Sequence, residues 1–202
     1  MDESGIRTPW SGRCFVYLLP CREEDTLKIG FARDPWARLA AFHRRFDRFF
    51  DLARGAVVET DRVREARAIE AALKTAFADA VTPAPLPVRA RAGGRFEWFR
   101  GVHAAAFEQM RSTSDALGYA FHAPLDAWLR DQWMVQLERI VDWSRDAYAL
   151  VETLHYNASS ELALPRERAL RERLEIWESI GIDIGLLLDG TAGQWYRCGF
   201  AD

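Results

Sequence analysis

The stretch FVYLLPCREEDTLKIGFARDPWARL, residues 15–39, decides how the rest of the chain is interpreted. It covers most of two short runs rich in β-branched and aromatic residues, CFVYLL (14–19) and LKIGF (27–31), with a polar segment between them. Such a pattern predicts a β-hairpin. Asp34 followed by Pro35 is typical of an N-cap and a first helical residue, so a helix is expected directly after the hairpin.

The remaining pattern predicts a first domain of mixed structure and a second domain of helices. The expected elements of the first domain, residues 1–120, are that helix to about residue 46, a strand at 55–60, a helix at 61–80, a proline- and glycine-rich loop at 81–94, a strand at 95–99 and a helix at 101–118. Residues 121–202 are expected to form a helical domain, with one helix from Pro124 to about Asn157 and a second from Pro165 to Gly181.

Composition excludes several classes of protein. A chain of 202 residues with 49% hydrophobic side chains suffices for one sizeable core or two small domains. No run of about 18 apolar residues predicts a membrane span, and the polar N-terminus does not resemble a signal peptide. Cys14, Cys21 and Cys198 cannot form a closed disulfide framework, so a reducing cytoplasm is the expected location. The chain has no Walker loop, dinucleotide glycine fingerprint or nucleophile elbow.

The net charge of −3 is unevenly distributed. Residues 1–110 hold 18 Lys and Arg against 15 Asp and Glu, whereas residues 111–202 hold 9 against 15. Only Lys28 and Lys74 are lysines, so the basic charge is almost entirely guanidinium. Arginine forms bidentate contacts with phosphate, which suits a nucleic-acid partner, although a compositional preference for arginine produces the same pattern.

Tyr17 and Lys28 are the first candidate site residues. Directly opposed residues of an antiparallel hairpin share a face. If Tyr17 lies opposite Lys28, the ammonium favours the phenolate, which suits a general base near neutral pH. The alternative is a surface tyrosine beside a surface lysine.

Arg38, four residues before Phe42, lies at the border of its helix's apolar face. It either reaches toward a developing phosphate charge or is an ordinary exposed arginine.

Glu70 is an acidic residue in an apolar stripe. The stripe of the helix expected at 61–80 is formed by Val63, Ala66, Leu73 and Phe77, and Glu70 lies in its middle. A buried carboxylate is costly unless it is paired, protonated or bound to a cation. A lone glutamate can hold one divalent ion whose other sites go to water and phosphate, as magnesium prefers. The alternatives are a salt bridge to a nearby arginine, or a side chain extending from the edge of the stripe.

Taken in order, these residues resemble the GIY-YIG nuclease superfamily. FVY, ten intervening residues, KIG, then Arg38, Glu70 and finally EWF are similar to the phage and bacterial branch that has KIG in place of YIG and a terminal EWF strand. The resemblance covers roughly residues 13–100. It departs from the family pattern at the missing glycine of the first motif, at Lys28 in place of the second tyrosine, and at Phe31, which leaves Arg33 as the nearest cation. An asparagine that is common near the end of the family's pattern is missing, and Glu97 lies in that region.

The resemblance implies an α/β (α+β) fold, with a small three-stranded antiparallel sheet flanked by helices and, here, an all-α C-terminal region after it. It implies that Tyr17 is a base or water-orienting phenol, that Lys28 orients water or binds phosphate, and that Arg38 stabilises the transition state. Glu70 is implied to be the sole protein ligand of Mg²⁺ or Mn²⁺. The activity implied is metal-dependent endonuclease hydrolysis of DNA phosphodiester bonds.

DNA is the expected partner, and four arginines are candidate phosphate contacts: Arg33, Arg44, Arg45 and Arg95. One alternative is a catalytically silent nucleic-acid-binding or regulatory module on the same fold. Another is an interaction protein that works through its acidic C-terminal half, which holds five of the eight tryptophans. That half is otherwise expected to be a helical cap or a homodimerisation element.

Overall fold

A computed structural model describes residues 12–88, 94 and 97–200. The chain divides into two compact units between Leu129 and Arg130. Residues 12–129 form an α+β unit, and the described residues of the second unit, 130–200, form helices joined by short turns. None of the helices in the described part of the chain combines the length and hydropathy that a membrane crossing requires.

The first unit is built on an antiparallel sheet with the strand order β4-β2-β1-β3-β5. Its strands are β1 (Cys14–Pro20), β2 (Thr26–Ala32), β3 (Ala56–Thr60), β4 (Trp98–Arg100) and β5 (Phe121–His122). The described residues therefore form five strands, and the expected three-stranded sheet is wrong. The flanking strands are only three and two residues long, so β5 in particular has no alternating pattern by which the sequence could reveal it.

The register of the hairpin also differs from the expected one. Tyr17 lies opposite Gly30, and Lys28 lies opposite Leu19, so Tyr17 and Lys28 are diagonal neighbours on one face of the sheet. Lys28 is opposed on its other side by Trp98 of β4. The five residues between the strands form a longer connection than a two-residue turn, and only short turns of defined type fix a register from sequence.

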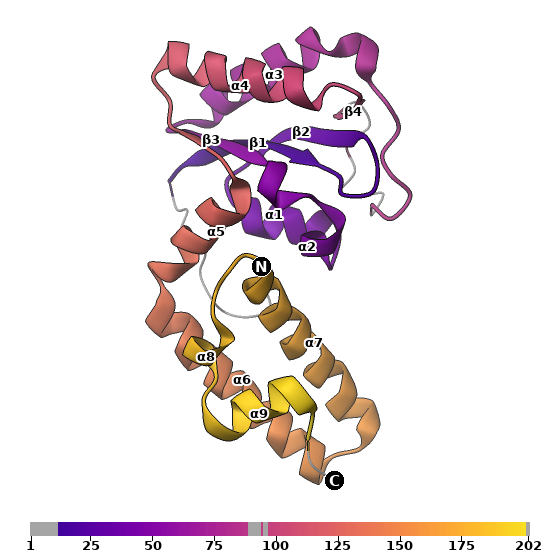
Figure 1. Ribbon diagram of the computed structural model, residues 1–202, viewed down its shortest axis with the longest axis vertical. Helices are drawn as coiled ribbons and strands as arrows, with labels where there is room; N and C mark the ends of the chain where they lie inside the picture. The colour runs from indigo at the N-terminus through magenta and orange to yellow at the C-terminus, as the bar shows by residue number, and fades with distance from the viewer. Residues whose placement is uncertain (1–11, 89–93, 95–96, 201–202) are drawn as a thin grey trace. The chain divides into compact units, whose positions relative to one another are not determined.

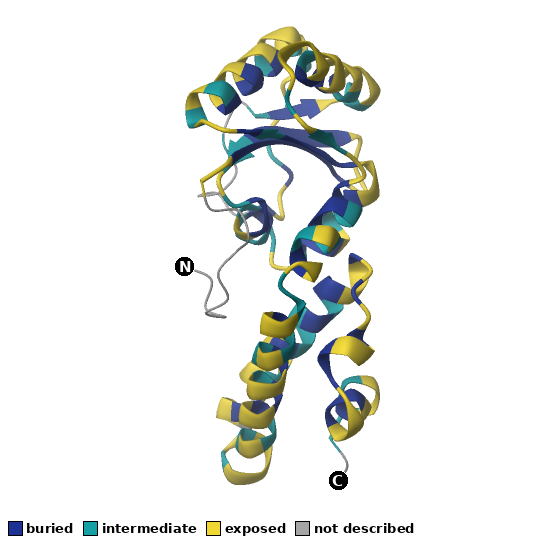
Figure 2. Cartoon of the chain, turned by 90° about the vertical axis from the view of Figure 1, so that its left-hand side faces the viewer, coloured by how far each residue is buried: buried dark blue, intermediate teal, exposed yellow. Residues whose placement is uncertain are grey.

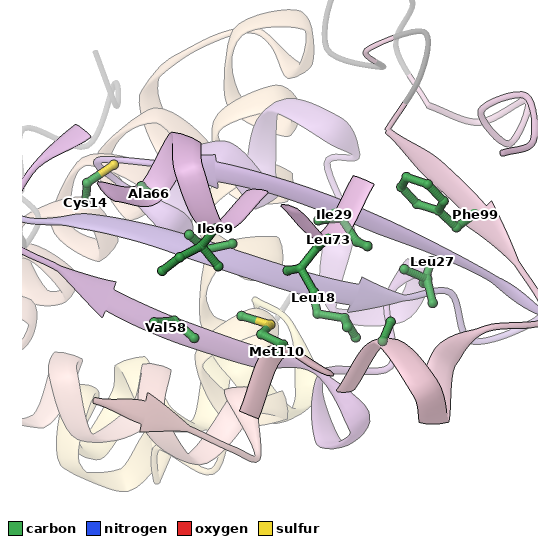
Figure 3. Close-up of a cluster of buried hydrophobic side chains, with 12 residues drawn as sticks. Cys14, Leu18, Leu27, Ile29, Val58, Ala66, Ile69, Leu73, Phe99 and Met110 are labelled. Carbon is green, nitrogen blue, oxygen red and sulfur yellow. The ribbon is translucent and has the colours of Figure 1, made fainter. Parts of the chain in front are cut away.

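Helices α3 (Val63–Ala76) and α4 (His103–Leu117) cover one face of the sheet, as Figure 1 shows. Figure 2 shows their buried sides turned toward the strands and their exposed sides turned to solvent. Alternate residues of β1 and β2 meet the apolar side of α3, because successive side chains of a strand point to opposite faces. The resulting core, drawn in Figure 3, includes Leu18, Ile29, Val58, Ile69, Leu73, Phe99 and Met110.

The opposite face of the sheet is covered by α1 (Pro35–Phe42) and α2 (Phe46–Phe49). The Asp34 side chain caps α1 by accepting a hydrogen bond from the Ala37 N–H at 2.9 Å. The single helix expected to residue 46 is interrupted at His43, whose backbone is extended and whose Nδ1 accepts a hydrogen bond from the Arg45 N–H. Two short 3₁₀ helices, η1 (Leu52–Arg54) and η2 (Ala78–Ala80), complete the connections.

The helices after β5 are α5 (Leu125–Met134), α6 (Leu137–Asn157), α7 (Ser160–Ser179), α8 (Ile184–Leu187) and α9 (Gly190–Cys198). The continuous helix expected from Pro124 to Asn157 is therefore broken between Met134 and Leu137. Pro165 lies inside α7 and does not open it. In the second unit, the rings of Trp133 and Trp143 meet Trp177 edge-on, with centroids 5.8 and 5.4 Å from it, and the fully buried Trp133 and Trp177 belong to its core.

Candidate functional site

The Tyr17 ring packs over Gly30 of the neighbouring strand β2. Its side chain is buried on β1, and a Cβ placed on Gly30 would lie 2.7 Å from the phenol Cζ. Only glycine at this position leaves room for the ring. The Arg38 Nε–H donates a hydrogen bond to the Tyr17 hydroxyl oxygen at 3.2 Å, and the Arg38 guanidinium lies 4.5 Å from the centroid of the Phe42 ring. The phenol and the guanidinium thus form one unit between β1 and α1.

Burial raises the pKa of Tyr17 to about 12, although the charge and hydrogen bond of Arg38 act to lower it. At neutral pH the group is therefore a neutral phenol. The phenolate expected from a directly opposed Lys28 has no support in this geometry, because the register shift separates the two side chains and desolvation outweighs the nearby positive charge.

Lys28 is entirely enclosed, with 0% of its side chain exposed. Its Nζ lies 5.4 Å from the ring centroids of both Phe42 and Trp98, and it forms an ion pair with the Glu97 carboxylate. Burial lowers the pKa of Lys28 to about 8, and the hydrogen bond and charge of Glu97 limit that decrease. The side chain of Lys28 therefore cannot contact a substrate in this conformation.

Glu97 and Lys74 belong to the same group of charges, and sequence reasoning assigned neither of them a role. Lys74 Nζ lies 3.3 Å from Glu97 Oε1 and 3.5 Å from Glu70 Oε1. Burial acts to raise the pKa of Glu97, but the two lysines outweigh it and hold the pKa below its usual value. The spacing of Lys74, four residues after Glu70 on the same helix, was the available signal.

Glu70 lies on the sheet side of α3 and is 9% exposed. Burial raises its pKa, and the charge of Lys74 opposes that effect. Its ion-pair partner is Lys74, not an arginine. Among the residues that the structure describes, no donor binds the second oxygen, Oε2, so this carboxylate retains the capacity to ligate a hard cation such as Mg²⁺ or Mn²⁺.

The structure thus brings Tyr17, Lys28, Arg38 and Glu70 into one neighbourhood. The rings and charges connect them: the Phe42 ring touches both Lys28 and Arg38, and the ionisation of Tyr17 is influenced by Glu97 and Glu70. The residues come from β1, β2, α1, α3 and the segment before β4. Such a cluster of buried, coupled titratable groups is typical of functional sites.

The four arginines proposed as phosphate contacts have different surroundings. Arg33 and Arg44 are exposed. Arg45 forms a two-pronged ion pair with the buried Asp47, at 3.2 and 3.0 Å, which points to a structural role. Arg95 lies outside the described residues. Arg67 was missed; it is exposed on α3, three residues before Glu70, with its guanidinium 5.7 Å from the Phe31 ring.

Comparison with known protein families matches residues 14–114 to the T5orf172 domain. No curated protein matches the chain, and no solved structure does. The matched half contains every residue of the charged cluster, from Tyr17 on β1 to Glu97 before β4. With this match over half of its length, the chain belongs to the T5orf172 domain family, a nuclease-like domain.

Proposed function

We propose that this protein is a metal-dependent endonuclease that hydrolyses DNA phosphodiester bonds with a GIY-YIG-type site. The observation that carries the proposal is the hydrogen bond between the buried Tyr17 phenol and the Arg38 guanidinium, together with a buried carboxylate, Glu70, whose charge acts on the ionisation of Tyr17. Membership of a nuclease-like domain family supports the same class of reaction.

Arg38 is the residue best suited to stabilise the charge of the transition state. A guanidinium presents five N–H donors, and its Nε–H is held by the Tyr17 hydroxyl, which orients the plane of the group. Tyr17 is a protonated phenol near neutral pH, because burial raises its pKa to about 12. It therefore orients the attacking water by hydrogen bonding and is not a resident phenolate base.

Glu70 is proposed as the residue that holds Mg²⁺ or Mn²⁺. The ion would supply positive charge to the phosphate and a water molecule of lowered pKa. The donor set fits a hard cation, because the Glu70 carboxylate is partly desolvated and its Oε2 accepts no hydrogen bond from the described residues. Lys74 balances the charge of Glu70 at 3.5 Å.

Arg33, Arg44 and Arg67 are proposed to contact the DNA backbone, since all three are exposed. Arg33 directly follows β2, and the Arg67 guanidinium lies 5.7 Å from the ring of Phe31 on the same strand. Phosphate contacts of this kind position a duplex without reading its sequence, and they make affinity depend strongly on salt.

A second candidate function is a binding module without catalysis. The observation that favours it is the complete burial of Lys28, which stands at the position of the second tyrosine of GIY-YIG nucleases. A group enclosed by two aromatic rings and a carboxylate cannot activate water directly. Salt-dependent DNA binding without strand cleavage would identify this alternative.

The deciding experiment is plasmid nicking by the purified protein in Mg²⁺ or Mn²⁺, with EDTA as the metal-free reference. Glu70→Gln removes the charge at nearly constant size, and Glu108→Gln, which removes an exposed ion pair with Arg111 on α4, is the matched control. Metal-dependent nicking that is lost in Glu70→Gln and kept in Glu108→Gln supports the nuclease. Nicking that survives Glu70→Gln excludes Glu70 as the metal ligand.

A further inference from the structure

Both lysines of the chain form an ion pair with the same carboxylate, that of Glu97. The sequence contains 27 basic residues, of which only Lys28 and Lys74 are lysines. The Lys28 ammonium pairs with Glu97 Oε2, and the Lys74 Nζ lies 3.3 Å from Glu97 Oε1. These residues come from β2, α3 and the segment before β4, so the contacts link elements that are far apart in the sequence.

Glu97 is also held firmly at the edge of the sheet. Its carbonyl oxygen accepts a hydrogen bond from the Ile29 N–H at 3.0 Å, and the next residue, Trp98, pairs with Lys28 in the β2–β4 register. Gly94, at φ +59°, lies close beside the pair, and a Cβ there would be 2.7 Å from the Glu97 Cδ. The backbone thus presents this carboxylate to the two ammonium groups in one defined orientation.

Lys28 and Glu97 differ in the exposed fraction of their side chains, and this difference indicates which of them can act on the site. The Lys28 side chain is 0% exposed, whereas the Glu97 side chain is 25% exposed. Lys28 can therefore influence the site only through the groups that it touches. Glu97 pairs with both lysines, and through Lys74 it is connected to Glu70.

We propose that Glu97 is a positioning residue, which holds the Lys28 and Lys74 ammonium groups and thereby orients the Glu70 carboxylate. The catalytic part of this inference rests on the proposed nuclease function. Without the Glu97 charge, Lys28 is a buried cation without its carboxylate partner, and such a group gives up its proton. Lys74 then interacts with Glu70 alone.

The first test measures the Lys28 contact directly by NMR of protein labelled with ¹³Cε-lysine. The chain gives only two lysine signals, and Lys74→Arg assigns them. Among the described residues, the charged groups that act on Lys28 include Glu97, Arg38 of α1, and Lys74 and Glu70 of α3. In Glu97→Gln the Lys28 pKa should fall by about 1–3 units below its wild-type value. Glu97→Asp should restore most of this loss, and Glu108→Gln should change nothing.

The second test measures kcat and KM for plasmid nicking against pH in the same variants. Loss of a residue that orients a metal ligand should lower kcat about 10–100-fold in Glu97→Gln. The KM for DNA should not rise, because a carboxylate does not bind phosphate. The loss should be larger at pH 8 than at pH 6, because the deprotonated Lys28 no longer supports the site.

The two tests separate failure of this inference from failure of the proposed function. An unchanged Lys28 titration in Glu97→Gln overturns the inference, as does a pH profile and kcat per folded molecule equal to those of the wild type. If the wild-type protein cuts no DNA, the nuclease proposal and the catalytic part of this inference fail together, and the lysine titration still decides whether Glu97 holds Lys28.

Discussion

Replacing Lys28 with methionine should stabilise the protein. The ammonium of Lys28 is fully buried between the rings of Phe42 and Trp98, and the Glu97 carboxylate forms an ion pair with it. Methionine has a similar length and fills the same space without a charge. Removing the buried charge removes its desolvation penalty, and the loss of the ion pair costs little where the remaining charge is partly solvated and keeps another partner.

The magnitude follows from the pKa of Lys28. The pKa falls from 10.5 to about 8 in the folded protein. Each unit corresponds to about 1.4 kcal/mol, so the charged lysine is disfavoured by about 3 kcal/mol relative to the unfolded chain. In Lys28→Met, Glu97 loses one partner but remains one-quarter exposed and keeps Lys74. The net gain in the free energy of unfolding at pH 7 should therefore be about 1–3 kcal/mol.

The gain should depend on pH in a defined direction. Between pH 8 and pH 10.5 the unfolded wild-type chain keeps the Lys28 proton that the folded protein has released. The unfolded state then binds more protons, so wild-type stability rises with pH in this window. The advantage of Lys28→Met should shrink from pH 8 upward and vanish above about pH 10.5. Tyr17 titrates alike in both proteins, and its contribution cancels.

The assay is urea unfolding followed by the Ile29 methyl NMR signal, which reports on the core of the first unit. Lys74→Met is the matched control, because the Lys74 side chain is 28% exposed and its loss leaves the buried Glu70 without its cation. That control should be destabilised. A Lys28→Met protein less stable than the wild type at pH 7, with a difference that does not change between pH 8 and pH 10, would refute the reasoning.

Four further substitutions test the geometry of the site. Gly30→Ala should destabilise the protein by about 1–3 kcal/mol in thermal unfolding, because the new Cβ would lie 2.7 Å from the Tyr17 Cζ; wild-type stability would contradict the packing. Tyr17→Phe should lower kcat for nicking about 100-fold, roughly the effect of losing one preorganised hydrogen-bond donor, and equal rates would exclude the hydroxyl from the reaction. Arg33→Ala should reduce the salt dependence of DNA binding, measured by filter binding, by about one ion and leave the stability unchanged. Arg45→Ala should lower the free energy of unfolding in urea by about 3 kcal/mol, because Asp47 is then left buried and unpaired. The opposite pattern in the two assays would reverse these roles.

The features that could be predicted from the amino-acid sequence are those that arise from neighbours along the chain. The Asp34–Pro35 pair predicted the start of α1, and the cap is present because the Asp34 oxygen reaches an N–H only three residues away. The position of Glu70 on the buried side of α3 likewise followed from helical spacing. Both features depend on one turn of backbone, whose geometry is the same in every protein.

The strand register and the pairing of charges arise from contacts between distant parts of the chain, and no local pattern predicts them. Whether Tyr17 faces Lys28 or Gly30 depends on how α3 and the strands pack, since a hairpin with a long connection has no local rule for its register. The bond between Lys28 and Glu97 joins residues 69 positions apart, and the burial of Lys28 arises from rings brought together by two other elements. Such contacts form because desolvation and packing act on the whole unit at once, and no short window of sequence contains those terms.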